Sequence, residues 1–182
     1  MDSLVLNFDD EEIDASELGE LLTSLSKMYS VIHYVMGSNA SLELKGNVPQ
    51  HYIESRTAEV VSNIQNLIIQ YAKNLDHPFE TSTDHMGGLI EYLHPNSSNI
   101  GRLKISRLTY NSPLRVDLKG TLMVLIVLTC IGGGEFSIGG AEGISVKMPG
   151  IGKTIKTIHE SIFDGDGLFE DKLEMILDER SN

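Results

Sequence analysis

The hydrophobic residues of this chain are most concentrated between residues 102 and 148, where a charged hairpin, an apolar run and a Gly-rich hairpin follow one another. The apolar run covers residues 121 to 131 and reads TLMVLIVLTCI. Its length of about ten residues and its mixture of Leu with β-branched residues fit both a strand and a helix. As a helix it would span about 15 Å, half of the roughly 30 Å hydrocarbon core of a bilayer, which excludes a simple transmembrane helix.

Alternating apolar and polar residues on both sides of the run predict two β-hairpins. The first covers residues 102 to 119 and presents one apolar and one basic face, and the second covers residues 135 to 148. Leu108 has switched parity relative to Ile105, which predicts a β-bulge near Ser106 to Arg107. Because the run lies between two hairpins, we expect it to be buried in the core of a sheet.

The N-terminal half carries two long amphipathic helical patterns. The first begins near Asp14 or Ser16, either of which suits the N-cap, and its apolar stripe continues through about five turns to Met36. The second covers roughly residues 53 to 75. Both stripes approach the seven-residue repeat of a coiled coil, so each helix has three candidate partners: the other helix, the sheet, or another copy of the chain.

Shorter patterns complete the chain. Residues 3 to 8 and 40 to 45 predict strands, residues 154 to 162 predict a helix, and an amphipathic helix is predicted after residue 167. The sequence therefore predicts an α+β fold, with two long amphipathic N-terminal helices and short strands followed by a mainly antiparallel, β-rich C-terminal half with terminal helices.

This pattern divides the chain into three parts. Residues 1 to 76 form a helical N-terminal part, and residues 77 to 101 form a connector with weak structural signals. Residues 102 to 182 contain the charged hairpin, the apolar segment and the C-terminal helices. One compact domain that includes all three parts is the alternative.

The formal net charge of −12 is distributed unevenly along the chain. Residues 1 to 20 contain eight acidic and no basic residues, and residues 164 to 182 contain seven acidic and two basic ones, so the intervening body is nearly neutral. Because phosphates attract Lys and Arg and repel carboxylates, this balance argues against nucleic acid as a partner.

Cysteine usage and the N-terminal residues bear on the cellular compartment. The single cysteine, Cys130, excludes an internal disulfide and is typical of a reducing environment. Its apolar neighbours indicate a small core residue rather than a nucleophile. The acidic N-terminus lacks the basic and long apolar regions of a secretory signal, so we expect a cytoplasmic protein.

Two glycine-containing segments resemble ligand-binding loops but depart from their patterns. In MPGIGKT, residues 148 to 154, a phosphate-binding loop would require glycine five positions before Gly152, and Lys147 stands there. The segment that begins at Asp164 resembles a calcium loop, but Phe169 occupies the glycine position and Met175 the position of the bidentate glutamate. We therefore interpret the two segments as a turn before a helix and an acidic loop.

The sequence offers one weak candidate for a metal or catalytic site. His85, Glu91 and His94 could supply metal ligands, but they lack the close spacing of an H-E-x-x-H motif. The chain has neither a G-x-S-x-G nucleophile elbow nor a cysteine followed by a matching histidine. We therefore expect no enzymatic activity, no cofactor and no metal.

Two sets of residues are candidates for contacts with other molecules. The basic hairpin face could be neutralised by the acidic ends of the chain itself, or it could bind an acidic partner or lipid headgroups. The stripe of the first helix could pack on another copy. The candidates are Arg102, Lys104, Arg115 and Lys119 on the hairpin, and Leu18, Leu25 and Ile32 on the helix.

The segment YNSPLRVDL, followed by the apolar run and the glycines, resembles a pattern in small uncharacterised bacterial accessory proteins, in which a Tyr-x-Ser-Pro-Leu hairpin precedes an apolar segment. The resemblance covers residues 103 to 134. It implies a bacterial source and an accessory role, and it assigns no catalytic residue.

These observations favour a non-catalytic subunit that binds a protein partner or assembles with itself. The alternative is a membrane-active oligomeric effector that inserts residues around 121 to 138, because about ten residues of strand can cross a bilayer within a barrel. A third hypothesis is an enzyme that acts on a small ligand or depends on a metal, with its site near His85, Glu91 and His94.

Overall fold

A computed structural model of the protein describes residues 2–9, 14–37, 49–74, 89–90, 92–93, 102–109, 114–138, 144–163, 171 and 175. The described residues combine one mixed β-sheet with helices, so the predicted α+β class is confirmed. Their elements are β1 (Asp2–Phe8), α1 (Ala15–Met36), α2 (Gln50–Asn74), β2 (Lys104–Thr109), β3 (Leu114–Gly120), α4 (Leu122–Ile131), β4 (Glu135–Ile138), β5 (Ile144–Met148) and α5 (Ile151–Phe163).

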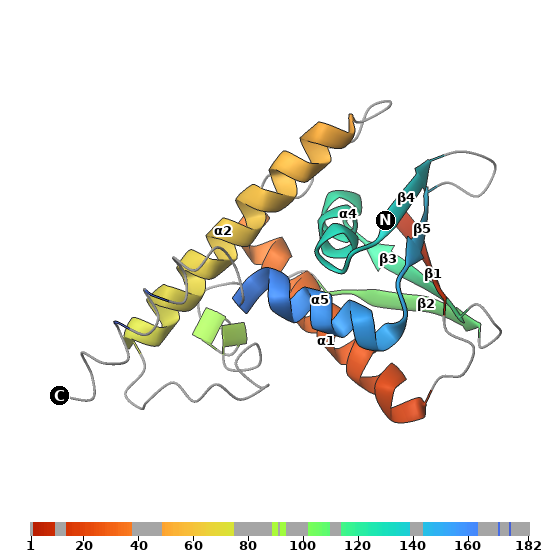
Figure 1. Ribbon diagram of the computed structural model, residues 1–182, viewed down its shortest axis with the longest axis horizontal. Coiled ribbons are helices and arrows are strands. Elements are labelled where there is room, and N and C mark those ends of the chain that lie inside the picture. The colour runs from red at the N-terminus through yellow and green to blue at the C-terminus, as the bar shows by residue number, and fades with distance from the viewer. Residues whose placement is uncertain are drawn as a thin grey trace.

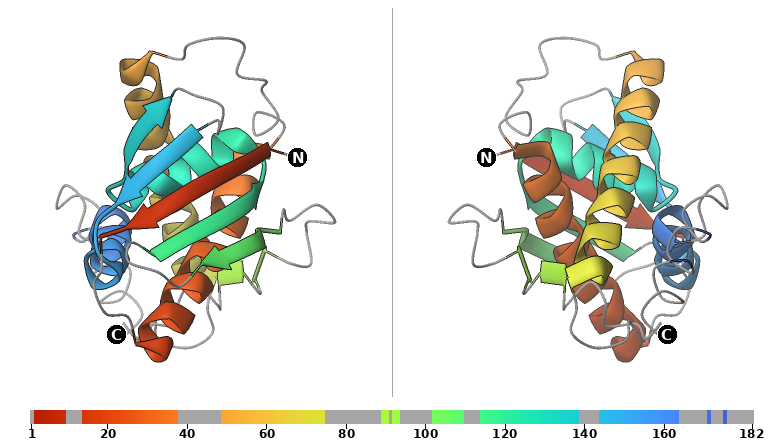
Figure 2. Two further views of the ribbon diagram at one scale, coloured as in Figure 1. Left: turned by 90° about the vertical axis from the view of Figure 1, so that its right-hand side faces the viewer. Right: turned by 90° about the vertical axis from the view of Figure 1, so that its left-hand side faces the viewer.

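The described strands form a five-stranded sheet in the order β2-β3-β1-β5-β4. The labelled helices all lie on one side of this sheet (Figure 1). Seen from the opposite side, the strands are in front and the helices behind them (Figure 2, left). The described part of the chain therefore has two layers, with its helices on one face of the sheet.

β1 lies at the centre of the sheet and joins segments that are far apart in the sequence. It pairs antiparallel with β3 and parallel with β5. Leu4, Leu6 and Phe8 are fully buried on its helix-covered side, because alternate side chains of a strand point to the same face. The strand predicted at residues 3 to 8 is thus confirmed, and the sheet unites the N-terminal strand with the strands of residues 104 to 148.

The apolar run forms the helix α4, so its predicted burial is confirmed and its predicted place within the sheet is wrong. Residues 123 to 129 are all buried, including the polar Thr129. α4 contacts β1 and β3 on the sheet side and α1, α2 and α5 on its other sides. A helix enclosed in this way has no solvent-exposed face, which explains why its sequence lacks the helical period of three to four residues.

Hydrogen bonds fix both ends of α4. At its N-terminus the backbone N–H of Thr121 donates to Oη of Tyr29 on α1 at 2.8 Å, and the Thr121 carbonyl accepts from the N–H of Leu125 at 3.0 Å. At its C-terminus Gly132 donates to the Leu128 carbonyl at 3.1 Å. Gly133 then turns the chain toward β4 with a φ of 77°, in the region that favours glycine.

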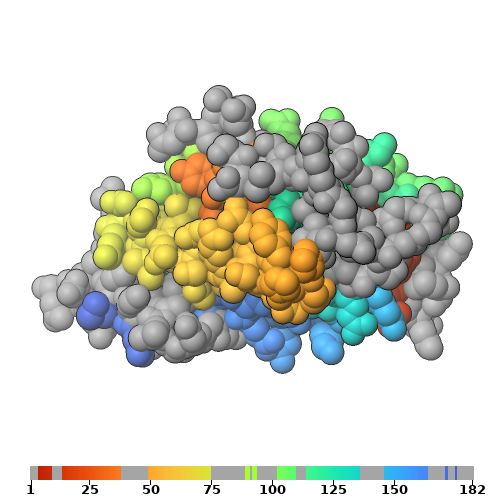
Figure 3. Space-filling view, turned by 90° about the horizontal axis from the view of Figure 1, so that it is seen from above, coloured from red at the N-terminus to blue at the C-terminus, as the bar shows by residue number. Residues whose placement is uncertain are grey.

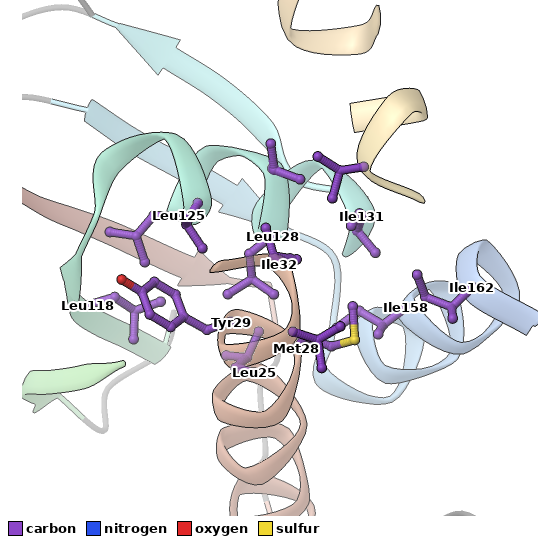
Figure 4. Close-up of a cluster of buried hydrophobic side chains, with 14 of the residues drawn as sticks. Leu25, Met28, Tyr29, Ile32, Leu118, Leu125, Leu128, Ile131, Ile158 and Ile162 are labelled. Atoms are coloured by element: carbon purple, nitrogen blue, oxygen red, sulfur yellow. The ribbon is translucent and has the colours of Figure 1, made fainter. Parts of the chain in front are cut away.

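The side chains of α1, α4 and α5 meet in a common core (Figure 4). α1 begins after Asp14, whose carboxylate accepts from the N–H of Ser16 at 2.6 Å, so the predicted N-cap is confirmed. α1 packs within the same chain against α2, α4 and α5, and Leu118 of β3 joins the same cluster. The labelled residues of this cluster are Leu25, Met28, Tyr29, Ile32, Leu118, Leu125, Leu128, Ile131, Ile158 and Ile162.

α2 forms the outer part of the helical layer and lies along the surface (Figure 3). It starts at Gln50 and confirms the predicted second helix. Its inward side contacts α4, α1 and α5 through buried residues at helical spacing, which are Ile53, Val60, Ile64, Ile68 and Ala72. The strand predicted at residues 40 to 45 and most of the terminal helix predicted after residue 167 lie outside the described residues.

Candidate interaction surface

The uncovered face of the sheet carries mainly polar and charged side chains. In β3 the helix-covered positions Leu114, Val116 and Leu118 are fully buried. The intervening Arg115, Asp117 and Lys119 lie on the opposite face, where they are partly or fully exposed. This alternation is the one expected for an antiparallel pair with one face on the core and one in water.

A β-bulge determines which residues of β2 join this face. Lys104 pairs with Lys119 and Arg107 with Asp117, with a register shift between Ile105 and Arg107. The hydroxyl of Ser106, the extra residue, donates to the Asp117 carbonyl at 3.1 Å. The predicted bulge is therefore confirmed.

The bulge places Arg107 on the uncovered face, and this residue is absent from the set predicted from the sequence. Simple alternation from Lys104 places Arg107 on the other face. The parity switch at Leu108 was the signal that could have identified it. We use the name basic sheet face for Lys104, Arg107, Arg115 and Lys119. Arg102 is exposed and precedes β2, outside the strand pairing.

Charge pairing on the uncovered face is incomplete. Nε of Arg115 lies 3.0 Å from Oδ1 of Asp117, so these two charges offset each other. Within the described part of the chain, no ion pair involves the other three side chains of the basic sheet face, Lys104, Arg107 and Lys119. Lys104 also stands directly opposite Lys119, an arrangement that is unfavourable for like charges. The region is therefore locally positive in a chain whose net charge is −12.

A second ion pair lies on β5, on the other side of β1. Nζ of Lys147 is 2.9 Å from Oδ2 of Asp9, and both side chains are largely exposed. The hydrogen bond that Lys147 donates to the Asp9 carboxylate, and after it the negative charge of Asp9, raise the pKa of Lys147 above its ordinary value. Lys147 is thus matched by an acid at close range, whereas Lys104 and Lys119 have no such acid among the described residues.

β2 forms one edge of the sheet and has apolar side chains that the helices do not cover. Ile105 is 43% exposed and Leu108 is 42% exposed. Their cross-strand neighbours on β3, Leu118 and Val116, are fully buried on the same face. β2 therefore has a basic side on the uncovered face, an apolar side toward the helices, and an outer edge that pairs with no described strand.

Two of the three predicted interaction residues of α1 are not available to a partner. Leu25 and Ile32 are fully buried in the core of the chain itself, and Leu18 is partly buried against that core. Their proposed role as partner contacts is wrong for Leu25 and Ile32, because α2, α4 and α5 of the same molecule already pack against α1. The sequence pattern of a buried helix and that of a coiled-coil seam are the same over this length.

The segment that resembles a phosphate-binding loop makes a turn between β5 and α5. The buried hydroxyl of Thr154 donates to the Pro149 carbonyl at 3.1 Å, so it is engaged by its own loop. His85, Glu91 and His94 lie outside the described residues, as does most of the acidic segment from residue 164 onward. Within the described ranges, no group of three His, Cys, Asp or Glu side chains could hold a metal ion.

Membrane insertion was the alternative for the apolar run. Among the described helices, none is both long enough and apolar enough to cross a membrane. α4 itself is enclosed by α1, α2, α5 and the sheet. The residues around 121 to 131 are therefore part of the packed core in this structure.

Cys130 is partly buried at the end of α4, close to α2. Burial raises the pKa of its thiol, although a hydrogen bond with Thr57 acts in the opposite direction and the charge of Glu54 raises the pKa further. Because the thiolate is the reactive species, we expect iodoacetamide at pH 8 to modify Cys130 at least about tenfold more slowly than in guanidinium-unfolded protein. Mass spectrometry over time measures both rates, and equal rates would contradict this placement of the thiol.

No protein-family model, curated protein or solved structure matches the chain at a significant level.

Proposed function

We propose that this protein is a non-catalytic accessory subunit that binds a protein partner through the basic sheet face. The observation that carries the proposal is the cluster of Lys104, Arg107 and Lys119, which make no ion pair within the described part of an acidic chain. We include a bacterial cytoplasm in the proposal, on the resemblance of residues 103 to 134 and on a single, partly buried cysteine.

The pairing of Lys104 with Lys119 is unfavourable in the isolated chain. Like charges directly opposite one another across an antiparallel pair are destabilising. Carboxylates from a partner would remove this repulsion between Lys104 and Lys119 and replace it with attraction. Complementary charge also increases the rate at which partners meet and disfavours partners of the wrong sign.

Self-assembly through the same face is disfavoured by the same charges. Two copies in contact there would bring two basic clusters together, without acids of comparable number on the described part of the face. We therefore propose a different, acidic protein as the partner. We expect the isolated protein to be monomeric in light scattering at physiological salt.

The test uses a photo-crosslinking amino acid at position 119, compared with the same residue at position 153. Lys119 is exposed on β3, and Lys153 is exposed on α5 in the other layer, so the two substitutions are chemically matched. In cells of the source organism, we expect position 119 to give a defined crosslinked protein that position 153 does not give. The additional substitutions Lys104→Glu and Arg107→Glu should abolish this product.

Three outcomes of the crosslinking experiment would contradict the proposal. The same products from both positions, no product from position 119, or a product that persists after both charge reversals would contradict the proposal. Circular dichroism of each variant confirms that the fold is retained, which we expect because all three side chains are exposed.

A further inference from the structure

We propose that the partner binds as an extended segment that adds a strand to the outer edge of β2, with acidic and apolar side chains in alternation. This inference rests on the proposed function and specifies its partner. It follows from the position of β2 at the end of the sheet, where one row of backbone N–H and C=O groups pairs with no described strand. Recognition by strand addition uses such an edge for affinity and the side chains on both faces for specificity.

The two sides of β2 determine the composition of the added strand. On the uncovered face, Lys104 and Arg107 are exposed. On the helix side, Ile105 and Leu108 are exposed to 43% and 42%. Because successive residues of an added strand point to opposite faces, acidic residues would reach the two bases while every second, apolar residue would cover Ile105 and Leu108.

A second copy of β2 fits this edge poorly. Antiparallel pairing of two β2 strands would keep the same face on the same side and place Lys104 and Arg107 of both copies next to each other. Lysine and a β-bulge on an edge strand are also the devices by which proteins prevent pairing between identical edges. An acidic segment converts the same lysine and arginine from repulsive into attractive groups.

Nucleic acid fits the surface less well than an acidic peptide. The net charge of −12 repels a polyanion, and the exposed Ile105 and Leu108 have no part in backbone phosphate binding. Sequence-independent binding of single strands also uses aromatic side chains for stacking. The described residues of β2 and β3 include none.

The probe is a fluorescein-labelled peptide in which Glu alternates with Val, compared with a peptide of equal composition in which the Glu and Val residues form two blocks. Fluorescence anisotropy with the full chain measures the dissociation constants. We expect the alternating peptide to bind more tightly than the block peptide. Lys104→Glu should weaken binding roughly fivefold, and Leu108→Ser should weaken it as well, whereas the matched Lys153→Glu should have no effect.

N-methylated versions of the peptide test whether its backbone pairs with the outer edge of β2. Methylation of alternate backbone nitrogens removes the donors from one edge of a strand, so two isomers can be made that block opposite edges. Strand addition predicts that one isomer loses binding and the other keeps it. Equal binding of both isomers, equal loss in both, or equal affinity of the block peptide would overturn the inference.

Two further results separate the inference from the proposed function. If the alternating peptide does not bind while position 119 still gives its crosslinked partner, strand addition is wrong and the proposed function stands. If labelled single-stranded DNA binds more tightly than the peptide and loses this affinity with Lys104→Glu, the partner class is wrong. If position 119 gives no partner, the proposed function fails irrespective of the peptide result.

Discussion

Replacement of Leu128 by Ala in α4 should lower the free energy of unfolding by about 3 to 4 kcal/mol. Removal of a fully buried Leu side chain costs the lost transfer free energy and leaves a cavity, which together amount to roughly 2 to 5 kcal/mol. Leu128 is fully buried in the cluster of Figure 4. It is enclosed by several elements at once, so the surrounding structure has little freedom to collapse into the space. Urea unfolding measures the change.

Leu108→Ala provides the matched control for this experiment. The chemical change is the same, but Leu108 is 42% exposed on the edge strand. We expect the free energy of unfolding to fall by about 1 kcal/mol or less. A loss below about 1 kcal/mol for Leu128→Ala would mean that α4 contributes little to the core, and it would favour the alternative in which this segment is held ready for membrane insertion.

The second large effect is expected at Gly120, where β3 ends against α1. A Cβ atom there would lie 2.6 Å from Oη, 2.8 Å from Cε2 and 2.9 Å from Cζ of Tyr29. The ring has little room to move, because it is 2% exposed and its hydroxyl accepts from Thr121 N–H. Overpacking of this kind costs roughly 1 to 3 kcal/mol, so we expect Gly120→Ala to destabilise the protein by about 3 kcal/mol.

Gly19 offers a control for which we expect the opposite change in stability. It lies within α1 and is exposed, and apart from its chain neighbours and the adjacent helix backbone no atom lies within 4 Å of the position of an added Cβ. Because Ala is favoured over Gly in a helix, Gly19→Ala should stabilise the protein by about 0.5 to 1 kcal/mol. Thermal unfolding of both variants tests the pair, and a stable Gly120→Ala protein would show that Tyr29 is placed differently from the structure.

Local patterns in the sequence identified the strands and helices in which apolar and polar residues alternate with a clear period. Leu108 revealed the bulge in β2 because its parity conflicts with that of Ile105, and the structure has the register shift at that point. The Asp14 cap and the long stripe of α1 were equally clear. In each case one face of the element is buried and the other is exposed, so the alternation is visible in the sequence.

The helix α4 could not be recognised by the same reasoning. Residues 123 to 129 are buried on every side, so the sequence carries no period that distinguishes a helix from a buried strand. The parallel pairing of β1 with β5 was equally hidden, because it joins Val5 to Ser145 across most of the chain. Such contacts are decided by the packing of the whole core.

The candidate surface was predicted in part. Lys104, Arg115 and Lys119 share one face as the hairpin pattern indicated, and Arg107 joins them through the bulge. The sequence could not show that this face lies outside the helical layer. That outcome depends on α1, α2, α4 and α5 all covering the opposite side, which gives the cluster its access to a partner (Figures 1 and 2).

The central claim is that the binding surface consists of the uncovered face of β2 and β3 together with the outer edge of β2. Nuclear magnetic resonance of the labelled protein, titrated with the alternating Glu-Val peptide, tests it most directly. We predict that the largest amide shift changes fall on residues 104 to 109 and on the neighbouring residues of β3, with small changes on α2 and α5. The largest changes on α2 or α5, or no changes on β2 at saturating peptide, would contradict the claim.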